Sequence, residues 1–135
     1  MSEIIVKNVE EKDASLIKHL ALSCPPLDVH TPYTYWVLCR YFNKSCFVMY
    51  DGEAPIGYIT AIDIDEGVFI WQIGVIESYR GRGYASLLID KVYEYAGLKN
   101  RDMFVTIDKE NKGSYNSFNG FCKKNNLKFE EIGSL

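Results

Sequence analysis

Several features that define common protein classes are missing from this sequence. Its four cysteines form no C-x-x-C pair and it has only two histidines, which argues against a zinc site. No apolar run approaches the roughly 18–20 residues of a transmembrane helix, and the first residues lack a signal-peptide pattern. Basic residues number 15 against 18 acidic ones, and the net charge of −3 argues against a nucleic-acid partner. We therefore expect a cytoplasmic protein with reduced cysteines and no metal, membrane or nucleic-acid partner.

Repeats, linkers and low-complexity segments are also lacking, so the sequence predicts one domain over residues 1–135. Apolar patterns predict helices over 12–23, 33–42, 82–96 and 112–125, the second capped by Thr31 with Pro32 at its first position. Strands are predicted over 3–9, 46–50, 55–64, 68–76, 103–107 and 128–132. This order predicts an α/β (α+β) fold, with a mixed sheet of about six strands and four helices on both faces.

One stretch, from Phe69 to Leu88, combines an apolar strand, a glycine-rich turn and an apolar helical face. The first turn of a helix leaves backbone N–H groups unpaired, and together with the helix dipole these attract anions. Gly81 and Gly83 let a ligand come close to the backbone. The pattern predicts a phosphate or pyrophosphate cradle, and the alternative is a surface turn whose glycines only cap and bend the chain.

Two common phosphate-binding patterns do not fit this turn. A dinucleotide fingerprint would need glycine at Ser86, and the Walker pattern is absent. Arg80-x-x-Gly83-x-Ala85 instead resembles the R/Q-x-x-G-x-G/A signature of the GNAT acyltransferase superfamily, whose loop binds the coenzyme A pyrophosphate. The resemblance implies a splayed sheet and acetyl-CoA as cosubstrate. It also implies cofactor contacts from Ile73, Gly74, Val75, Arg80, Gly81, Arg82, Gly83, Tyr84 and Ala85.

A second block, Asn111-x-x-Ser114-x-x-x-Phe118, resembles the family's N-x-x-A-x-x-x-Y and implies further cofactor contacts from these three residues. Over about residues 4–127 the chain is more specifically similar to the diaminobutyrate acetyltransferases of ectoine biosynthesis, notably at Asp28–Tyr33 and Trp71-Gln72. Those enzymes continue into a longer tail rich in histidine and acidic residues, whereas this chain stops at Leu135. The resemblance implies an acyl-CoA-dependent N-acetyltransferase that acts on a primary amine of a small, diamino-acid-like molecule.

The residues for acetyl transfer are fewer than in many GNAT enzymes. Phe118 stands where many have a tyrosine that protonates the leaving thiolate, so Tyr115, nearly one turn earlier, is the candidate acid, with a packing or surface role as the alternative. The resemblance makes Asp28 the candidate to bind the amine or accept its proton. No cysteine has an evident thiolate-stabilising neighbour, so we expect direct attack in a ternary complex rather than an acyl-cysteine.

The acceptor pocket is predicted to include Tyr33, Trp71 and Gln72 as well as Asp28. Trp71 and Gln72 are adjacent in a strand and should point to opposite faces, with Trp71 favoured as the pocket wall. Gly74 within the same strand suggests a bulge or a close approach by a ligand.

Two other functions remain open at this stage. A protein or peptide N-terminal acetyltransferase would need only a weak base, because an α-amine has a pKa of about 7.7–8.0. A non-catalytic coenzyme A-binding regulatory protein would fit the short C-terminus and the missing tyrosine. That short C-terminus also implies a bare sheet edge, and we expect a homodimer in which the neighbour covers it.

Overall fold

The computed structural model describes residues 3–25, 27–108, 110–131 and 133. A sheet of five strands in the order β1-β2-β3-β4-β5 forms its centre, antiparallel from β1 to β4, with β5 parallel to β4. The expected mixed sheet is confirmed. The strands are β1 Ile4–Asn8, β2 Phe47–Asp51, β3 Ala54–Ile64, β4 Gly67–Val75 and β5 Met103–Val105.

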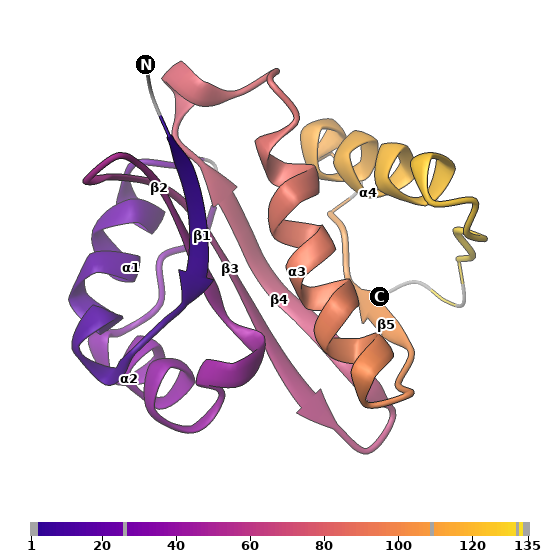
Figure 1. Ribbon diagram of the computed structural model, residues 1–135, viewed down its shortest axis with the longest axis horizontal. Helices are drawn as coiled ribbons and strands as arrows, with labels where there is room; N and C mark the ends of the chain where they lie inside the picture. Colours follow the sequence, from indigo (N-terminus) through magenta and orange to yellow (C-terminus); the bar gives the residue numbers. More distant parts are fainter. Residues whose placement is uncertain (1–2, 26, 109, 132, 134–135) are drawn as a thin grey trace.

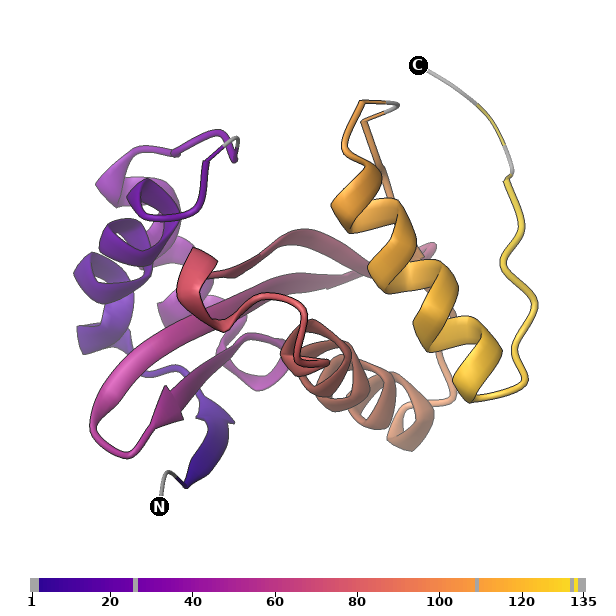
Figure 2. The same ribbon diagram turned by 90° about the horizontal axis from the view of Figure 1, so that it is seen from above.

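Four helices cover the sheet, as the sequence predicts, two on each face (Figures 1 and 2). Helices α1 and α2 enclose one apolar cluster with Val48 and Tyr58, and α3 and α4 enclose another with Met49 and Ile59. Since neighbours along β2 and β3 fall in different clusters, these strands are buried on both faces. The helices are α1 Ala14–Leu22, α2 Pro32–Tyr41, α3 Tyr84–Leu98 and α4 Lys112–Lys124, with short 3-10 turns at Glu11–Asp13, Asn43–Ser45 and Glu77–Tyr79.

Local signals explain where the helices begin and end. Thr31 Oγ1 accepts a hydrogen bond from the backbone N–H of Thr34 at 3.2 Å, which confirms the predicted cap of α2. Helix α3 was expected to stop before Gly97 but continues to Leu98. Its end is set by Asn100, which takes a left-handed φ of 54° while the N–H of Arg101 returns to the carbonyl of Ala96.

The prediction of a sixth strand over 128–132 is wrong for residues 128–131. Residues 128–131 form no strand, and Ile132 lies outside the described residues. The chain after α4 instead runs back along the outside of that helix (Figure 2), where the Phe129 ring lies 5.5 Å from the Tyr115 ring. The Phe129 side chain therefore packs on α4, whereas the sequence prediction placed it in the sheet.

The bulge expected near Gly74 lies at Trp71. Thr60 pairs with Gln72 and the next residue of β3, Ala61, pairs with Ile70, so Trp71 is an extra residue in β4. Gly74 is needed for packing, because a Cβ there would lie 2.9 Å from Leu27 Cδ1. Without the bulge, residues 70 and 72 would share a face of the sheet. With it, Ile70 joins the α3 and α4 core while Gln72 faces α1 and α2.

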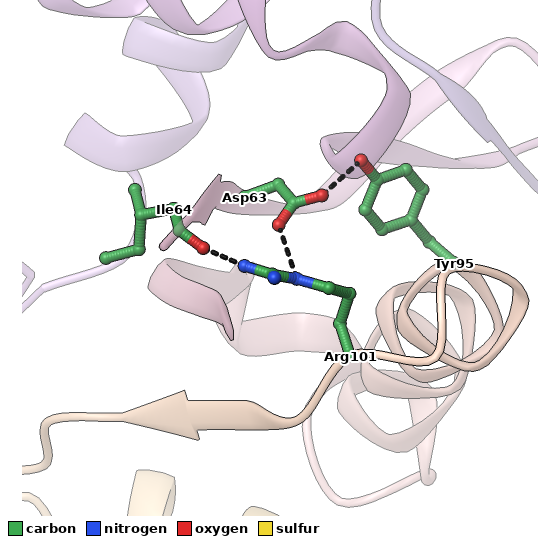
Figure 3. Close-up of polar contacts among 4 residues, drawn as sticks. All are labelled: Asp63, Ile64, Tyr95 and Arg101. Carbon is green, nitrogen blue, oxygen red and sulfur yellow. Dashed lines mark hydrogen bonds and ion pairs between the residues drawn. The ribbon is translucent and has the colours of Figure 1, made fainter. Parts of the chain in front are cut away.

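At the far end of β3, a polar cluster ties the end of α3 to the sheet (Figure 3). Asp63 accepts hydrogen bonds from Arg101 Nε and from the Tyr95 hydroxyl, each at 3.1 Å, and Arg101 also donates to the carbonyl of Ile64. Burial, with the hydrogen bond to Asp63 as a second cause, raises the pKa of Tyr95. Because Arg101 directly precedes β5, the cluster sets where the last strand enters the sheet.

Candidate functional site

The site lies where β4 and β5 separate. The two strands pair only from Val68 to Ile70 and from Met103 to Val105, although β4 continues to Val75. This confirms the splayed sheet expected from the sequence. A pocket of about 80 Å³ opens between them, lined by residues 70–73, residues 105–108, Leu27, Asn111, Ser114 and Phe118.

Backbone N–H groups of β4 point into this opening. The N–H of Gln72 donates to Thr60 Oγ1 at 3.1 Å and that of Ile76 donates to the carbonyl of Ile56 at 2.9 Å, so both point towards β3. Successive N–H groups of a strand point to opposite edges. Those of Ile73 and Val75 therefore face the opening, where they can stabilise a developing oxyanion. Gly74, expected as a cofactor contact, directs its N–H towards β3 instead.

The glycine-rich turn has the geometry of an anion cradle. Gly81 and Gly83 have φ angles of 79° and 83°, which glycine adopts without strain. A Cβ at either position would meet nothing within 4 Å, so the turn is open. In the part of the chain that the structure describes, the N–H groups of Gly81, Arg82 and Gly83 have no acceptor, and Gly83 is the N-cap of α3. The N–H groups of Tyr84 and Ala85 continue the cradle into the first turn of that helix.

The two arginines of this turn are held by the protein. Arg80 Nε donates to the carbonyl of Val75 at 2.9 Å, and a second nitrogen lies 3.4 Å from the carbonyl of Pro25. Arg82 lies over the ring of Tyr79 at 5.2 Å. Arg80 therefore fastens the turn to the end of β4, and the unpaired backbone N–H groups of the turn provide donors for an anion.

A hydrogen-bond network around Gln72 joins β4 to the loop before α2. Gln72 Oε1 accepts from the hydroxyls of Tyr35 at 3.0 Å and Tyr58 at 2.9 Å, and Gln72 Nε2 donates to the backbone carbonyl of Asp28. Burial is the main cause that raises the pKa of Tyr58, so its hydroxyl stays protonated. Tyr35 and Tyr58 were not predicted as site residues, since no short motif contains them.

The predicted acceptor residues meet around the same loop. The Trp71 ring lies 5.3 Å from the His30 ring, so Trp71 and Gln72 both reach residues 28–30. The expectation that they point to opposite faces of the sheet is therefore wrong. Asp28 is exposed. Tyr33 is 71% exposed and stacks on Trp36 at 6.0 Å, so in this structure it borders the loop without enclosing it.

Helix α4 contributes the other wall of the pocket. Asn111 caps the helix by accepting from the N–H of Ser114 at 3.0 Å, and both line the pocket with Phe118. Tyr115 lies outside the pocket lining, is 51% exposed and packs against Phe129. The structure thus does not bring the predicted acid to the opening, because Tyr115 falls on a different side of the helix from Ser114 and Phe118.

The cysteines are unsuited to nucleophilic roles. Burial raises the pKa of Cys39 and Cys46 to about 12. Burial also raises the pKa of Cys24 by more than the nearby Arg80 guanidinium lowers it. Thiolates are disfavoured at all three positions.

Comparison with known proteins assigns the class. The model of the "Acetyltransferase (GNAT) family" matches residues 15–121, and the chain belongs to this family. Among curated relatives, the L-2,4-diaminobutyric acid acetyltransferase of Shouchella clausii is 38% identical over 107 residues, 76% of this chain and 60% of the relative. That of Chromohalobacter salexigens is 31% identical over 121 residues, 85% of this chain and 62% of the relative. The chain thus spans about 60% of the length of these relatives.

Solved structures agree with this assignment. The diaminobutyrate acetyltransferase of Paenibacillus lautus, in complex with L-2,4-diaminobutyric acid and coenzyme A, superposes with a TM-score of 0.80 at 25% identity over 93% of this chain and 78% of that one. An aminoglycoside N-acetyltransferase in complex with coenzyme A shares the fold, with a TM-score of 0.77 at 18% identity over 100% of this chain and 94% of that one.

The described residues provide neither a metal-ligand cluster nor a membrane-spanning helix. No group of three or more histidine, cysteine, aspartate or glutamate side chains there could hold a metal ion. None of the helices that the structure describes is both long and apolar enough to cross a bilayer.

Substitution of Tyr58 tests the energetics of the network. Tyr58→Phe removes one donor to Gln72, and we expect the free energy of unfolding at pH 7 to fall by about 1 kcal/mol. Because the pKa of Tyr58 is raised in the fold, its contribution is present below a pH of about 10 and is lost above it. Urea unfolding should therefore show a smaller loss of stability between pH 9 and pH 11 for Tyr58→Phe than for the wild type. Tyr41→Phe, at a 65% exposed position, is the control and should match the wild type at both pH values.

Proposed function

We propose that this protein transfers the acetyl group of acetyl-CoA to a primary amine of a small, diamino-acid-like molecule, by direct attack in a ternary complex. One observation carries the proposal: a turn of unpaired amides, Gly81 to Gly83, follows the strand whose free N–H groups face the opening beside β5. Similarity to the diaminobutyrate acetyltransferases supports the choice of acceptor.

The cofactor would be bound mainly by backbone groups. The N–H groups of the turn suit the pyrophosphate of coenzyme A, and Asn111, Ser114 and Phe118 would flank its pantetheine arm. The thioester carbonyl would then meet the N–H groups of Ile73 and Val75, which can stabilise the oxyanion as the amine attacks. Positioning of this kind can lower the activation free energy of acetyl transfer by at most about 7–11 kcal/mol.

The acceptor amine must lose a proton before it attacks. A lysine-like amine has a pKa of about 10.4, so about one molecule in 10³ is neutral at pH 7. We assign Asp28 to bind the ammonium group, and its exposed carboxylate can pass the proton to water. Trp71 and Tyr33 would border the rest of the amine. The leaving thiolate would take its proton from solvent, since Tyr115 lies outside the pocket lining.

Direct attack rather than an acyl-cysteine is supported by the raised pKa values of Cys24, Cys39 and Cys46. A cytoplasmic location stays a prediction, and it fits the four free cysteines of the chain.

The first test concerns the cofactor turn. Gly83→Ala should weaken coenzyme A binding about tenfold or more, because a Cβ disfavours the positive φ that aims the amides. Gly52→Ala is a matched control: Gly52 also has a positive φ, of 62°, and open space around it, but it lies in the β2–β3 turn. The Gly52→Ala variant should lose about as much folding stability as Gly83→Ala, but its affinity for coenzyme A in isothermal titration should equal that of the wild type. Absence of wild-type binding at about 100 μM acetyl-CoA would overturn the cofactor assignment.

The second test concerns the acceptor. A thiol-release assay over diamino acids, polyamines, amino acids and peptide N-termini should give the highest kcat/KM with a short diamino acid. Asp28→Asn should raise the KM for that amine about tenfold, equivalent to about 1.4 kcal/mol, and leave the KM for acetyl-CoA unchanged. Asp65→Asn, in the turn at the opposite end of β4, is the control. Preference for peptide N-termini would favour the N-terminal acetyltransferase, and binding without turnover would favour a regulatory protein.

We also propose a homodimer. Within the described residues, the edge of β5 that faces away from β4 has no partner strand, and such edges attract pairing. A second copy covering this edge would satisfy its N–H and C=O groups. Light scattering at working concentration should give twice the mass of the chain, and a single-chain mass would contradict the proposal.

A further inference from the structure

The side-chain oxygen of Gln72 is fully used by hydrogen bonds within the protein, and one N–H of its amide is used as well. The residue is 7% exposed, and Tyr35 and Tyr58 beside it are fully buried. Both lone pairs of Oε1 are occupied by the two tyrosine hydroxyls, and Nε2 donates to the carbonyl of Asp28. The sequence placed Gln72 among the substrate-binding residues, whereas its contacts are all with the protein.

These contacts converge on a segment without regular secondary structure. Residues 28–30 link α1 to α2 and carry Asp28. Gln72 holds the carbonyl of Asp28, and the Tyr35 hydroxyl that donates to Gln72 also accepts from the N–H of His30 at 3.2 Å. The segment is therefore fixed at two backbone points by one side-chain network rooted in β4.

We propose that Gln72 and Tyr35 are positioning residues that hold the acceptor loop, residues 28–30, over the opening between β4 and β5. Gln72 acts through the backbone carbonyl of Asp28. The kinetic part of this inference rests on the function proposed above, but the structural part does not.

Glutamine is suited to this position by its chemistry. Glutamate would present a second acceptor to the Asp28 carbonyl and could not donate to it. Leucine would leave two buried tyrosine hydroxyls and one carbonyl without partners, and such groups are costly. The glutamine amide meets both needs, because its oxygen accepts from two hydroxyls while its nitrogen donates to a carbonyl.

Two tyrosine variants form a matched pair. Tyr35→Phe and Tyr58→Phe each remove one hydroxyl that donates to Gln72 Oε1, but only Tyr35 also binds the N–H of His30. Backbone hydrogen exchange over residues 27–31 should accelerate about tenfold or more in Tyr35→Phe and Gln72→Glu, and about threefold or less in Tyr58→Phe. Exchange over residues 81–86 should stay unchanged in all three.

Kinetics supply the second measurement. Tyr35→Phe and Gln72→Glu should raise the KM for the acceptor amine about fivefold or more and change the KM for acetyl-CoA less than twofold. Equal effects of the two tyrosine variants on exchange, or equal rises in both KM values, would overturn the proposal. If the wild type turns over no amine, the proposed function fails, and hydrogen exchange still decides whether the network holds the loop. If Gln72→Glu does not fold, the tyrosine pair decides.

Discussion

One extra residue in β4, at Trp71, is the constraint on which the acceptor side of the site depends. It moves Gln72 out of the apolar core beneath α3 and α4 and onto the face that carries Tyr35 and Tyr58. In an unbroken strand Gln72 would share the face of Ile70, beside an apolar core. A single-residue offset thus decides whether this buried amide is satisfied, because a shift of one position in a strand exchanges its two faces.

The same strand leaves polar groups open where a ligand can use them. Beyond Ile70, β4 loses β5 as a neighbour, so the N–H groups of Ile73 and Val75 have no ladder partner on that side. Arg80 takes the carbonyl of Val75 and anchors the turn that follows. Buried backbone groups without partners are rare, and groups left unpaired at an opening can bind water or a ligand at little cost. The fold therefore concentrates its unpaired donors in one place, along β4 and into the turn of Gly81 and Gly83.

The sequence predicted the parts of the site that depend on neighbouring residues. The turn before α3 and the helix over 112–125 are local patterns, and the structure confirms the turn and a helix at Lys112–Lys124. The Gln72 network joins residues 14, 37 and 44 positions apart and depends on a bulge at a tryptophan, which carries no bulge signature. A bulge was expected at Gly74 because a glycine within a strand can indicate either irregular backbone or tight packing. Here tight packing against Leu27 explains why the residue is glycine. The strand expected over 128–132 is wrong for residues 128–131, because a short local stretch cannot reveal that Phe129 packs on α4.

The two halves of the site are consequently held by different kinds of interaction. Backbone geometry over a few consecutive residues fixes the cofactor turn, and it tolerates change elsewhere as long as the glycines and the start of α3 remain. Side chains from α2, β3 and β4 fix the acceptor loop, and the bonds to Gln72 join elements that are distant in sequence. Substitutions in the second group can reshape the acceptor side while the turn keeps its form.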